Sequence, residues 1–171
     1  DSLGQAVTRE PVYITWDSEA AEKGGYEHFM MKEINEEPRA LKDTIIPRIR
    51  DGLIKFEHVD LDREMLENTD HIHIVACGTA SHAGVVGKYV IEKLCRIPVK
   101  VDVASEFRYR DPIIGENTLV IIISQSGETL DTLAAMREAK KSGARIVAIV
   151  NVVGSSIARE ADSVIYTAAG P

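Results

Sequence analysis

The residues of this chain that could do chemistry stand where apolar stretches end in glycine and hydroxyl residues. Residues 121–129 are the clearest case, because a β-branched stretch ends in Ser124-Gln125-Ser126-Gly127-Glu128-Thr129 and a helix then begins. Backbone N–H groups at a helix N-terminus lack intrahelical partners and lie at the positive end of the helix dipole, so they bind anions without a lysine. The side chains of Ser124, Ser126 and Thr129 can add hydroxyl donors. The pattern predicts a phosphate-binding turn.

The same residues also allow a purely structural interpretation. Ser126 could be the N-cap of the helix, Gly127 a turn residue, and Glu128 an acid that complements the helix dipole. The turn alone therefore leaves phosphate binding and simple capping both open.

A second turn of this kind follows another apolar stretch, at Cys77-Gly78-Thr79-Ala80-Ser81. Ligands of open parallel sheets bind beyond the carboxyl ends of the strands, where the crossover connections diverge. If the two strands are neighbours, both turns face one pocket. We therefore expect Cys77, Gly78, Thr79, Ser124, Gln125, Ser126 and Thr129 to bind a ligand together.

Two nucleotide fingerprints fail when they are compared with the sequence. Gly78 and Gly84 do not satisfy G-x-G-x-x-G, and Gly87-Lys88 is followed by Tyr89 and lacks the earlier glycine of a Walker A loop. These mismatches disfavour dinucleotides and nucleoside triphosphates, and a monophosphate remains.

Three further groups of residues have competing interpretations. His71 and His73 share one face of a strand as a metal pair would, but a structural role is favoured because a third ligand is lacking. Cys77 could be a nucleophile, yet no histidine partner is evident, so its backbone is expected to line the pocket. The charged residues that follow the second strand indicate a salt-bridged surface or subunit contact ahead of substrate contact; these are Glu106, Arg108 and Arg110.

Hydrophobic periodicity predicts the elements that position these residues. Apolar strands are expected at 71–76, 99–103, 119–123, 145–150 and 163–166. One amphipathic helix is expected between the first two strands, with small residues that let its backbone approach the sheet, and a second at about 128–142, stopped by Gly143. Strands that are apolar on both faces and joined by helices indicate an α/β fold. The prediction is a three-layer α/β/α sandwich with a five-stranded parallel sheet.

The first part of the chain has a different pattern. Residues 1–17 look extended, a helix is expected at about 26–35, and Pro38 is expected to open another helix with a bend at Pro47. Its apolar stripe is Leu41, Ile45, Ile46 and Ile49. We predict a linker at 1–22, a helical segment at 23–68 that packs on the sandwich, and the sandwich itself at 69–171.

Composition narrows the class of protein. With 171 residues, 44% of them hydrophobic and 27% charged, the chain fits a soluble globular domain with an appendage. A net charge of −7 argues against nucleic-acid binding, and no apolar run is long enough for a membrane span. Cys77 and Cys95 are too few for a disulfide framework, which favours the cytoplasm.

Four blocks of residues, read together, resemble the glucosamine-6-phosphate synthases, also called glutamine:fructose-6-phosphate amidotransferases. The blocks are residues 23–34, Ala76-Cys77-Gly78-Thr79, residues 104–110 and residues 124–129. They are similar to the first sugar isomerase (SIS) subdomain of that family, and the resemblance runs essentially end to end. The block at 124–129 alone would indicate only an SIS domain, and the block at 23–34 narrows it to the synthases.

The resemblance implies an enzyme with a glutaminase domain and two SIS subdomains that aminate and isomerise fructose 6-phosphate. It implies that Ser124, Gln125, Ser126 and Thr129 hold the phosphate of fructose 6-phosphate or glucosamine 6-phosphate. The turn from Cys77 to Thr79 would line the sugar, a homodimer is expected, and no cofactor is called for. Ala80 stands where family members often carry serine, which removes one possible phosphate donor.

By the same resemblance, the chain starts near the end of the glutaminase domain and stops before the second SIS subdomain. The parts beyond it would carry the acid–base groups and the lysine that forms a Schiff base, so we expect binding without turnover. A stand-alone SIS module that senses a sugar phosphate, and a purely structural subdomain, are the alternatives.

Overall fold

The structure is a computed structural model that describes residues 5–6, 22–57, 59–61 and 63–170. The extended stretch predicted at 1–17 lies outside the described residues apart from residues 5 and 6, and residue 22 is the only other described part of the predicted linker.

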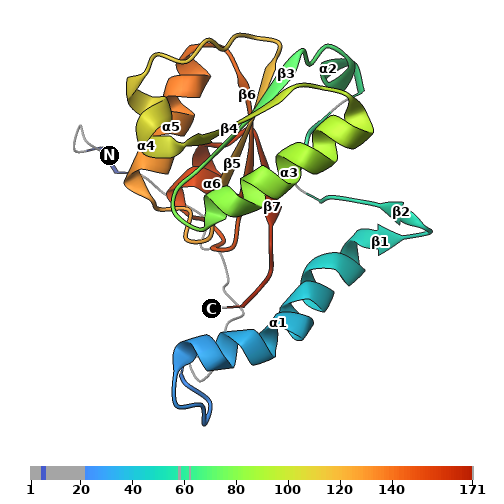
Figure 1. Cartoon of the computed structure of the whole chain (residues 1–171), viewed down its shortest axis with the longest axis vertical. Helices are drawn as coiled ribbons and strands as arrows, with labels where there is room; N and C mark the ends of the chain where they lie inside the picture. Colours follow the sequence, from blue (N-terminus) through green and yellow to red (C-terminus); the bar gives the residue numbers. More distant parts are fainter. Residues whose placement is uncertain (1–4, 7–21, 58, 62, 171) are drawn as a thin grey trace.

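A five-stranded parallel sheet forms the centre of the chain (Figure 1). Its strands run in the order β4-β3-β5-β6-β7. Their bounds are β3 (His71–Ala76), β4 (Val99–Val103), β5 (Thr118–Ser124), β6 (Arg145–Val150) and β7 (Ser163–Tyr166). The predicted strands are confirmed, with β5 running from Thr118 to Ser124 where residues 119–123 were expected. Because β3 and β5 are paired in register, the turns that follow them leave the same edge of the sheet side by side.

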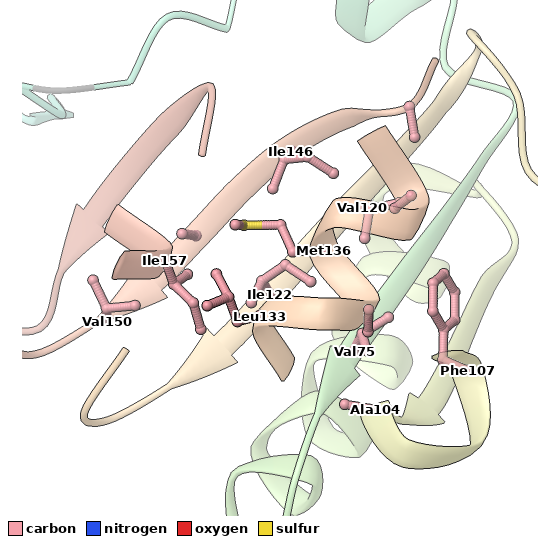
Figure 2. Close-up of a cluster of buried hydrophobic side chains, with 14 of the residues drawn as sticks. Val75, Ala104, Phe107, Val120, Ile122, Leu133, Met136, Ile146, Val150 and Ile157 are labelled. Atoms are coloured by element: carbon pink, nitrogen blue, oxygen red, sulfur yellow. The ribbon is translucent and has the colours of Figure 1, made fainter. Parts of the chain in front are cut away.

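Helices cover both faces of the sheet, so the three-layer sandwich is confirmed (Figure 1). Helix α3 (Ala80–Cys95) lies on one face, and α4 (Ala104–Tyr109), α5 (Leu130–Lys141) and α6 (Ser156–Glu160) lie on the other. The larger core cluster fills the second interface, where Met136 and Leu133 of α5 meet side chains of β5 and β6 (Figure 2). Burial of this apolar surface holds α5, and hence the turn before it, at a fixed height above the sheet.

Close packing of α3 depends on the small residues predicted for that purpose. A Cβ placed on Gly84 would lie 2.9 Å from Ile74 Cγ2 and 3.3 Å from Val101 Cγ1. Any larger residue would push the helix away from β3 and β4.

Helix α5 begins later than its sequence pattern indicated. Its N-cap is Thr129 and its first helical residue is Leu130, so Glu128 lies outside the helix and Ser126 is not the N-cap. The physical reason is that the positive φ of Gly127, +66°, keeps the chain in a turn beyond Ser126. The predicted stop is confirmed, since Gly143 follows the last turn with a φ of +85°.

The N-terminal helices differ from the prediction. One helix, α1 (Phe29–Ile45), runs through Pro38, and a 3₁₀ turn, η2 (Ile46–Arg48), contains Pro47. The prediction that Pro38 opens a new helix is wrong, because a proline inside a helix costs one hydrogen bond and bends the axis without having to end it. Figure 1 shows α1 changing direction along its length.

Ile49 was expected on a helical stripe but lies in a hairpin of β1 (Ile49–Arg50) and β2 (Leu53–Ile54). Its turn is Asp51-Gly52, with φ values of +57° and +74°, which is the conformation that this dipeptide favours in hairpins. A short helix, α2 (Arg63–Glu67), leads into β3.

Helix α1 stands away from the sandwich (Figure 1). Its apolar residues Phe29, Met30 and Ile34 are 52, 72 and 56% exposed, so this stripe is not buried against the sheet. Polar contacts join the two parts near the end of α1, where the Thr44 hydroxyl donates to Thr167 O. The boundaries at 1–22, 23–68 and 69–171 stay a prediction.

Candidate functional site

The candidate site lies at the carboxyl edge of the sheet, between β3 and β5. The crossover after β3 runs to α3 on one face, whereas that after β5 runs to α5 on the other, so the two turns diverge at this point. Such a switch point leaves a crevice between neighbouring strand ends.

The structure brings all of the predicted site residues together around one pocket of about 310 Å³. Side chains and backbone of both turns line it, together with three residues that the sequence analysis did not select. The lining residues are Cys77, Gly78, Thr79, Ala80, Ile123, Ser124, Gln125, Ser126, Thr129 and Thr132.

Hydroxyl groups shape the turn from Ser124 to Thr129. The N–H of Gly127 donates to Ser124 Oγ at 3.0 Å, and the N–H of Glu128 donates to Ser126 Oγ at 3.2 Å. Ser124 Oγ also lies 3.4 Å from Thr129 Oγ1. Because the serine oxygens accept these bonds, the hydroxyl hydrogens stay available as donors. The turn can therefore offer O–H groups to a ligand while its own backbone remains folded.

Helix α5 points its N-terminus at this pocket. The first N–H with an intrahelical partner is that of Leu133, which donates to Thr129 O at 2.9 Å. The preceding helical N–H groups lie at the positive end of the dipole. The one acid in the first turn, Asp131, is paired with Arg108 at 3.1 Å, which reduces its repulsion of an anion.

The segment after β6 supports the turn from behind. The N–H groups of Asn151 and Val152 donate to Gln125 O at 3.0 and 3.3 Å, and that of Ile157 donates to Gly127 O at 3.0 Å. Gly127 also packs so tightly that a Cβ there would lie 2.1 Å from Ser155 Oγ. The turn is therefore fixed by contacts with the segment that follows β6, which is distant from it in the sequence.

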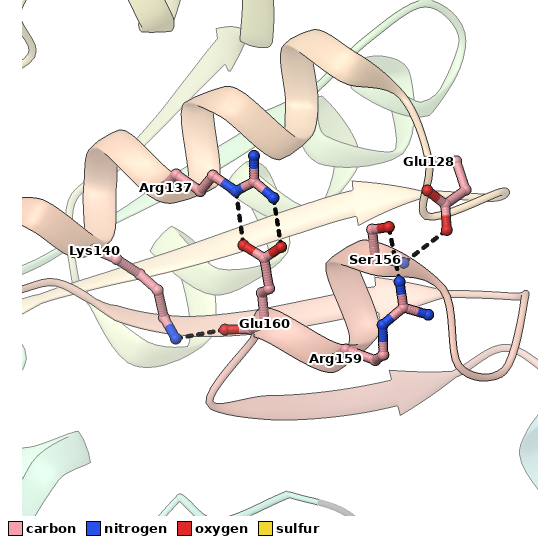
Figure 3. A network of polar contacts seen from close by, with 6 residues as sticks. All are labelled: Glu128, Arg137, Lys140, Ser156, Arg159 and Glu160. Carbon is pink, nitrogen blue, oxygen red and sulfur yellow. Dashed lines mark hydrogen bonds and ion pairs between the residues drawn. The ribbon is translucent and has the colours of Figure 1, made fainter. Parts of the chain in front are cut away.

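Glu128 points away from the pocket and toward α6 (Figure 3). Its Oε1 accepts the N–H of Ser156 at 2.7 Å, and this bond holds the pKa of the Glu128 carboxyl below its ordinary value. Figure 3 also shows Arg137 of α5 in a two-bond contact with Glu160 of α6, at 2.7 and 2.6 Å, and this partner lowers the pKa of Glu160. Together these contacts tie the turn, α5 and α6 to one another.

A larger cavity of about 480 Å³ adjoins the pocket and shares Thr79, Ala80, Ile123, Ser124 and Gln125 with it. Residues of α1, the end of β6 and the C-terminal stretch form its other walls; they include Glu37, Leu41, Ile149, Asn151, Thr167 and Ala169. Buried Asn151 fixes the C-terminal stretch here, because its Oδ1 accepts from Thr167 Oγ1 and Ala169 N, each at 2.9 Å. Space for a larger ligand therefore continues from the pocket toward α1.

The strand histidines have partners within the protein. His71 Nε2 lies 3.1 Å from Thr118 Oγ1, and buried His73 has its Nδ1 3.3 Å from Asp102 Oδ2. Arg110 donates to the same oxygen at 2.6 Å. Burial raises the pKa of Asp102, but the hydrogen bond with His73 and the charge of Arg110 outweigh burial and hold that pKa below its ordinary value. Within the described residues, no group of three histidine, cysteine or acidic side chains is arranged to hold a metal ion.

Ser81, the residue after Ala80, provides no substitute hydroxyl. The Ser81 side chain donates to Gly78 O at 2.7 Å, and Ser81 is not part of the pocket wall. Cys77 is a free thiol and lines the pocket, and Ala80 contributes a methyl group to the same wall.

Sequence reasoning missed three parts of the site. Thr132 follows Thr129 by three residues, and helical spacing could have placed both on one face. Asn151 stands at the carboxyl end of β6, where ligand sites of such sheets lie, so its position was a usable signal. Nothing local indicated that α1 would form a wall of the larger cavity.

Comparisons with known proteins identify the family of this chain. The SIS domain family profile matches residues 65–171. The glutamine–fructose-6-phosphate aminotransferases [isomerizing] of Clostridium tetani and Clostridium acetobutylicum are 61 and 64% identical over 172 and 169 residues. These matches cover 100 and 98% of this chain, which spans 28% of the length of each relative. No helix among the described residues is long and apolar enough to span a membrane.

A solved structure of a similarly named enzyme has the same fold as this chain. The C-terminal domain of glucosamine-fructose-6-phosphate aminotransferase from Francisella tularensis superimposes with a TM-score of 0.81 and 45% identity. The superposition covers 88% of this chain and 43% of that one.

Proposed function

Because this chain belongs to the SIS domain family, as its match over residues 65–171 shows, we propose that its pocket binds the phosphate of a hexose 6-phosphate. The observation that carries the proposal is the meeting of the α5 N-terminus with the hydroxyls of Ser124, Ser126 and Thr129 in one pocket. Free N–H and O–H donors favour a phosphate group there. The turn from Cys77 to Thr79 and the adjoining cavity leave room for the sugar.

The relatives that are named as glutamine–fructose-6-phosphate aminotransferases suggest the identity of the sugar. We propose fructose 6-phosphate and glucosamine 6-phosphate as ligands, and a role for this chain as a sugar-phosphate-binding part of such an enzyme. Identity above 60% across the whole chain supports this assignment over other members of the fold.

The pocket is proposed to bind without catalysing a reaction on its own. Amination and isomerisation of a sugar need groups that move protons at neutral pH or form a Schiff base. Apart from the Cys77 thiol, the residues that line the 310 Å³ pocket carry hydroxyl, amide or apolar side chains, and none of them is histidine, lysine, aspartate or glutamate. We expect no turnover of fructose 6-phosphate by the 171-residue chain.

Titration with fructose 6-phosphate, followed by amide chemical shifts, tests the proposal. Shifts are expected in residues 124–132, inorganic phosphate should reproduce the part near α5, and fructose without phosphate should cause none. Ser126→Ala should weaken binding by about 10-fold or more, because a hydrogen bond to a charged group is lost.

Ser142→Ala provides the matched control, since the Ser142 hydroxyl donates to Glu138 O at the far end of α5, away from the pocket. Its affinity should equal that of the wild type. The proposal is wrong if signals of residues 124–132 do not move at millimolar ligand, or if both serine variants bind as the wild type does.

Two wider expectations belong to the same proposal. A homodimer is proposed because α1 leaves apolar residues such as Met30 and Ile34 exposed, and sedimentation that shows only monomer would contradict it. A cytoplasmic location is proposed because Cys77 and Cys95 are both free thiols.

A further inference from the structure

Thr132 has an unexplained position in the wall of the phosphate pocket. It lies in the first turn of α5, three residues after the N-cap Thr129, and it lines the same 310 Å³ pocket. Residues three apart in a helix lie on one face, so Thr132 faces the strand end beside Thr129.

The hydroxyl of Thr132 is buried and unsatisfied. The residue is 0% exposed, and Oγ1 has no hydrogen-bond partner among the described residues. Threonine in a helix often relieves this situation by donating to a carbonyl one turn earlier, but no such bond is made here. A buried hydroxyl without a partner destabilises a fold, and valine would fill the same space without that penalty.

The hydroxyls of the turn from Ser124 to Thr129 have partners within that turn. Ser124 and Ser126 each accept a backbone N–H, and Thr129 lies next to Ser124. Two hydroxyl residues of this pocket wall, Ser124 and Thr132, are at least nine-tenths buried. Of these two, Thr132 is the one whose hydroxyl makes no hydrogen bond to any described residue. A donor without a partner in the described part of the protein, at the positive end of a helix, is suited to an oxygen of a bound ligand.

We propose that Thr132 is a ligand-binding residue of this pocket, and that its hydroxyl donates to a phosphate oxygen of the bound sugar phosphate. The inference rests on the proposed function of the site and adds a contact to it. Thr132 thereby extends the donor set from the turn into the helix, so that the anion is held from two sides.

Two matched variants separate this role from packing. Thr132→Val removes the hydroxyl and keeps the shape, whereas Thr132→Ser keeps the hydroxyl and removes a methyl group. Isothermal titration of the full chain with fructose 6-phosphate and with inorganic phosphate gives the affinities, and thermal unfolding without ligand gives the stabilities.

The two assays should rank the variants in opposite order. Thr132→Val is expected to unfold at or above the wild-type temperature but to raise the Kd for both ligands by about 10- to 100-fold. Thr132→Ser is expected to unfold earlier, because a buried methyl group is lost, and to bind within about threefold of the wild type.

Each alternative result has a definite meaning. If the wild type binds fructose 6-phosphate and Thr132→Val binds it within twofold, the role of Thr132 is wrong and the proposed function stands. Thr132→Val that loses as much stability as Thr132→Ser would show a structural hydroxyl and overturn the inference. If the wild type binds neither phosphate ligand, the proposed function fails and the inference fails with it.

Discussion

Gly127→Ala is the sharpest test of how the phosphate-binding turn is built. Gly127 has a φ of +66°, in the left-handed region that side chains disfavour. A Cβ at this position would lie 2.1 Å from Ser155 Oγ and 2.6 Å from Ser155 Cβ. The substitution therefore adds backbone strain and a steric clash at one residue.

The two effects can be given magnitudes separately. A non-glycine residue in the left-handed region costs about 1–2 kcal/mol. Forcing an extra carbon into a packed site costs typically about 1–3 kcal/mol more. We expect Gly127→Ala to lower the free energy of unfolding by about 2–5 kcal/mol, and each kcal/mol lowers Tm by about 2–4 °C in a chain of this length.

Gly154→Ala is the matched control. Gly154 has a φ of +72°, but a Cβ there would meet nothing within 4 Å, so the variant carries the backbone strain without the clash. Urea unfolding of both variants isolates the steric part, which should be about 1–3 kcal/mol. Adding Ser155→Gly to Gly127→Ala should recover most of that part, whereas adding it to Gly154→Ala should not.

The affinity for fructose 6-phosphate gives a second measurement. Gly127→Ala should abolish detectable binding, because the donors on both sides of residue 127 are displaced together, while Gly154→Ala should bind as the wild type does. Equal losses of stability in the two glycine variants would refute the argument that contact with Ser155 fixes the turn.

Two pH-dependent predictions follow from the same structure. The Ser156 N–H lowers the pKa of Glu128. The Glu128 carboxylate therefore stabilises the folded chain at pH values above the ordinary pKa of a glutamate, and this stabilisation is lost as the pH falls through the folded-state pKa. Glu128→Gln should flatten the acid side of the curve of Tm against pH, and an unchanged curve would contradict this. The pKa of Asp102 is lowered as well, so its contribution to stability is also lost as the pH falls. Asp102→Asn should lower the free energy of unfolding by about 2–3 kcal/mol at neutral pH, because His73 and Arg110 lose a charged acceptor. A loss below about 0.5 kcal/mol in urea unfolding would exclude a stabilising role for the Asp102 carboxylate.

Local patterns were sufficient to predict the sandwich. Each strand of the sheet is an apolar run bounded by turn residues, and α3 and α5 carry apolar stripes at helical spacing. These signals depend on residues that are close in sequence. The pairing of β3 with β5 was not predicted but was a condition for placing both turns at one pocket, and the structure meets that condition.

The two misplaced helix boundaries have different causes. Pro38 is a strong local signal for a helix boundary, yet α1 continues through it, because the cost of one missing hydrogen bond can be borne by a long helix. Glu128 looks like a first-turn acid of α5, but its carboxylate accepts from Ser156, 28 residues further on. Contacts over such separations leave no periodic trace in the sequence, so propensity and capping rules assign the residue to the wrong partner.

The distribution of acceptors explains how a chain with a net charge of −7 can present a site for an anion. Four acceptors next to the pocket that could repel a phosphate are already occupied: Gln125 O and Gly127 O by N–H groups of the segment after β6, the Glu128 carboxylate by α6, and the Asp131 carboxylate by Arg108. Donors are left on the pocket side, from the hydroxyls and from the first turn of α5. Since these partners come from the fold itself, the local potential is set by hydrogen bonding within a few ångströms and depends little on the total charge. Weakening a supporting contact behind the turn should therefore reduce phosphate affinity even when the phosphate-facing residues are intact.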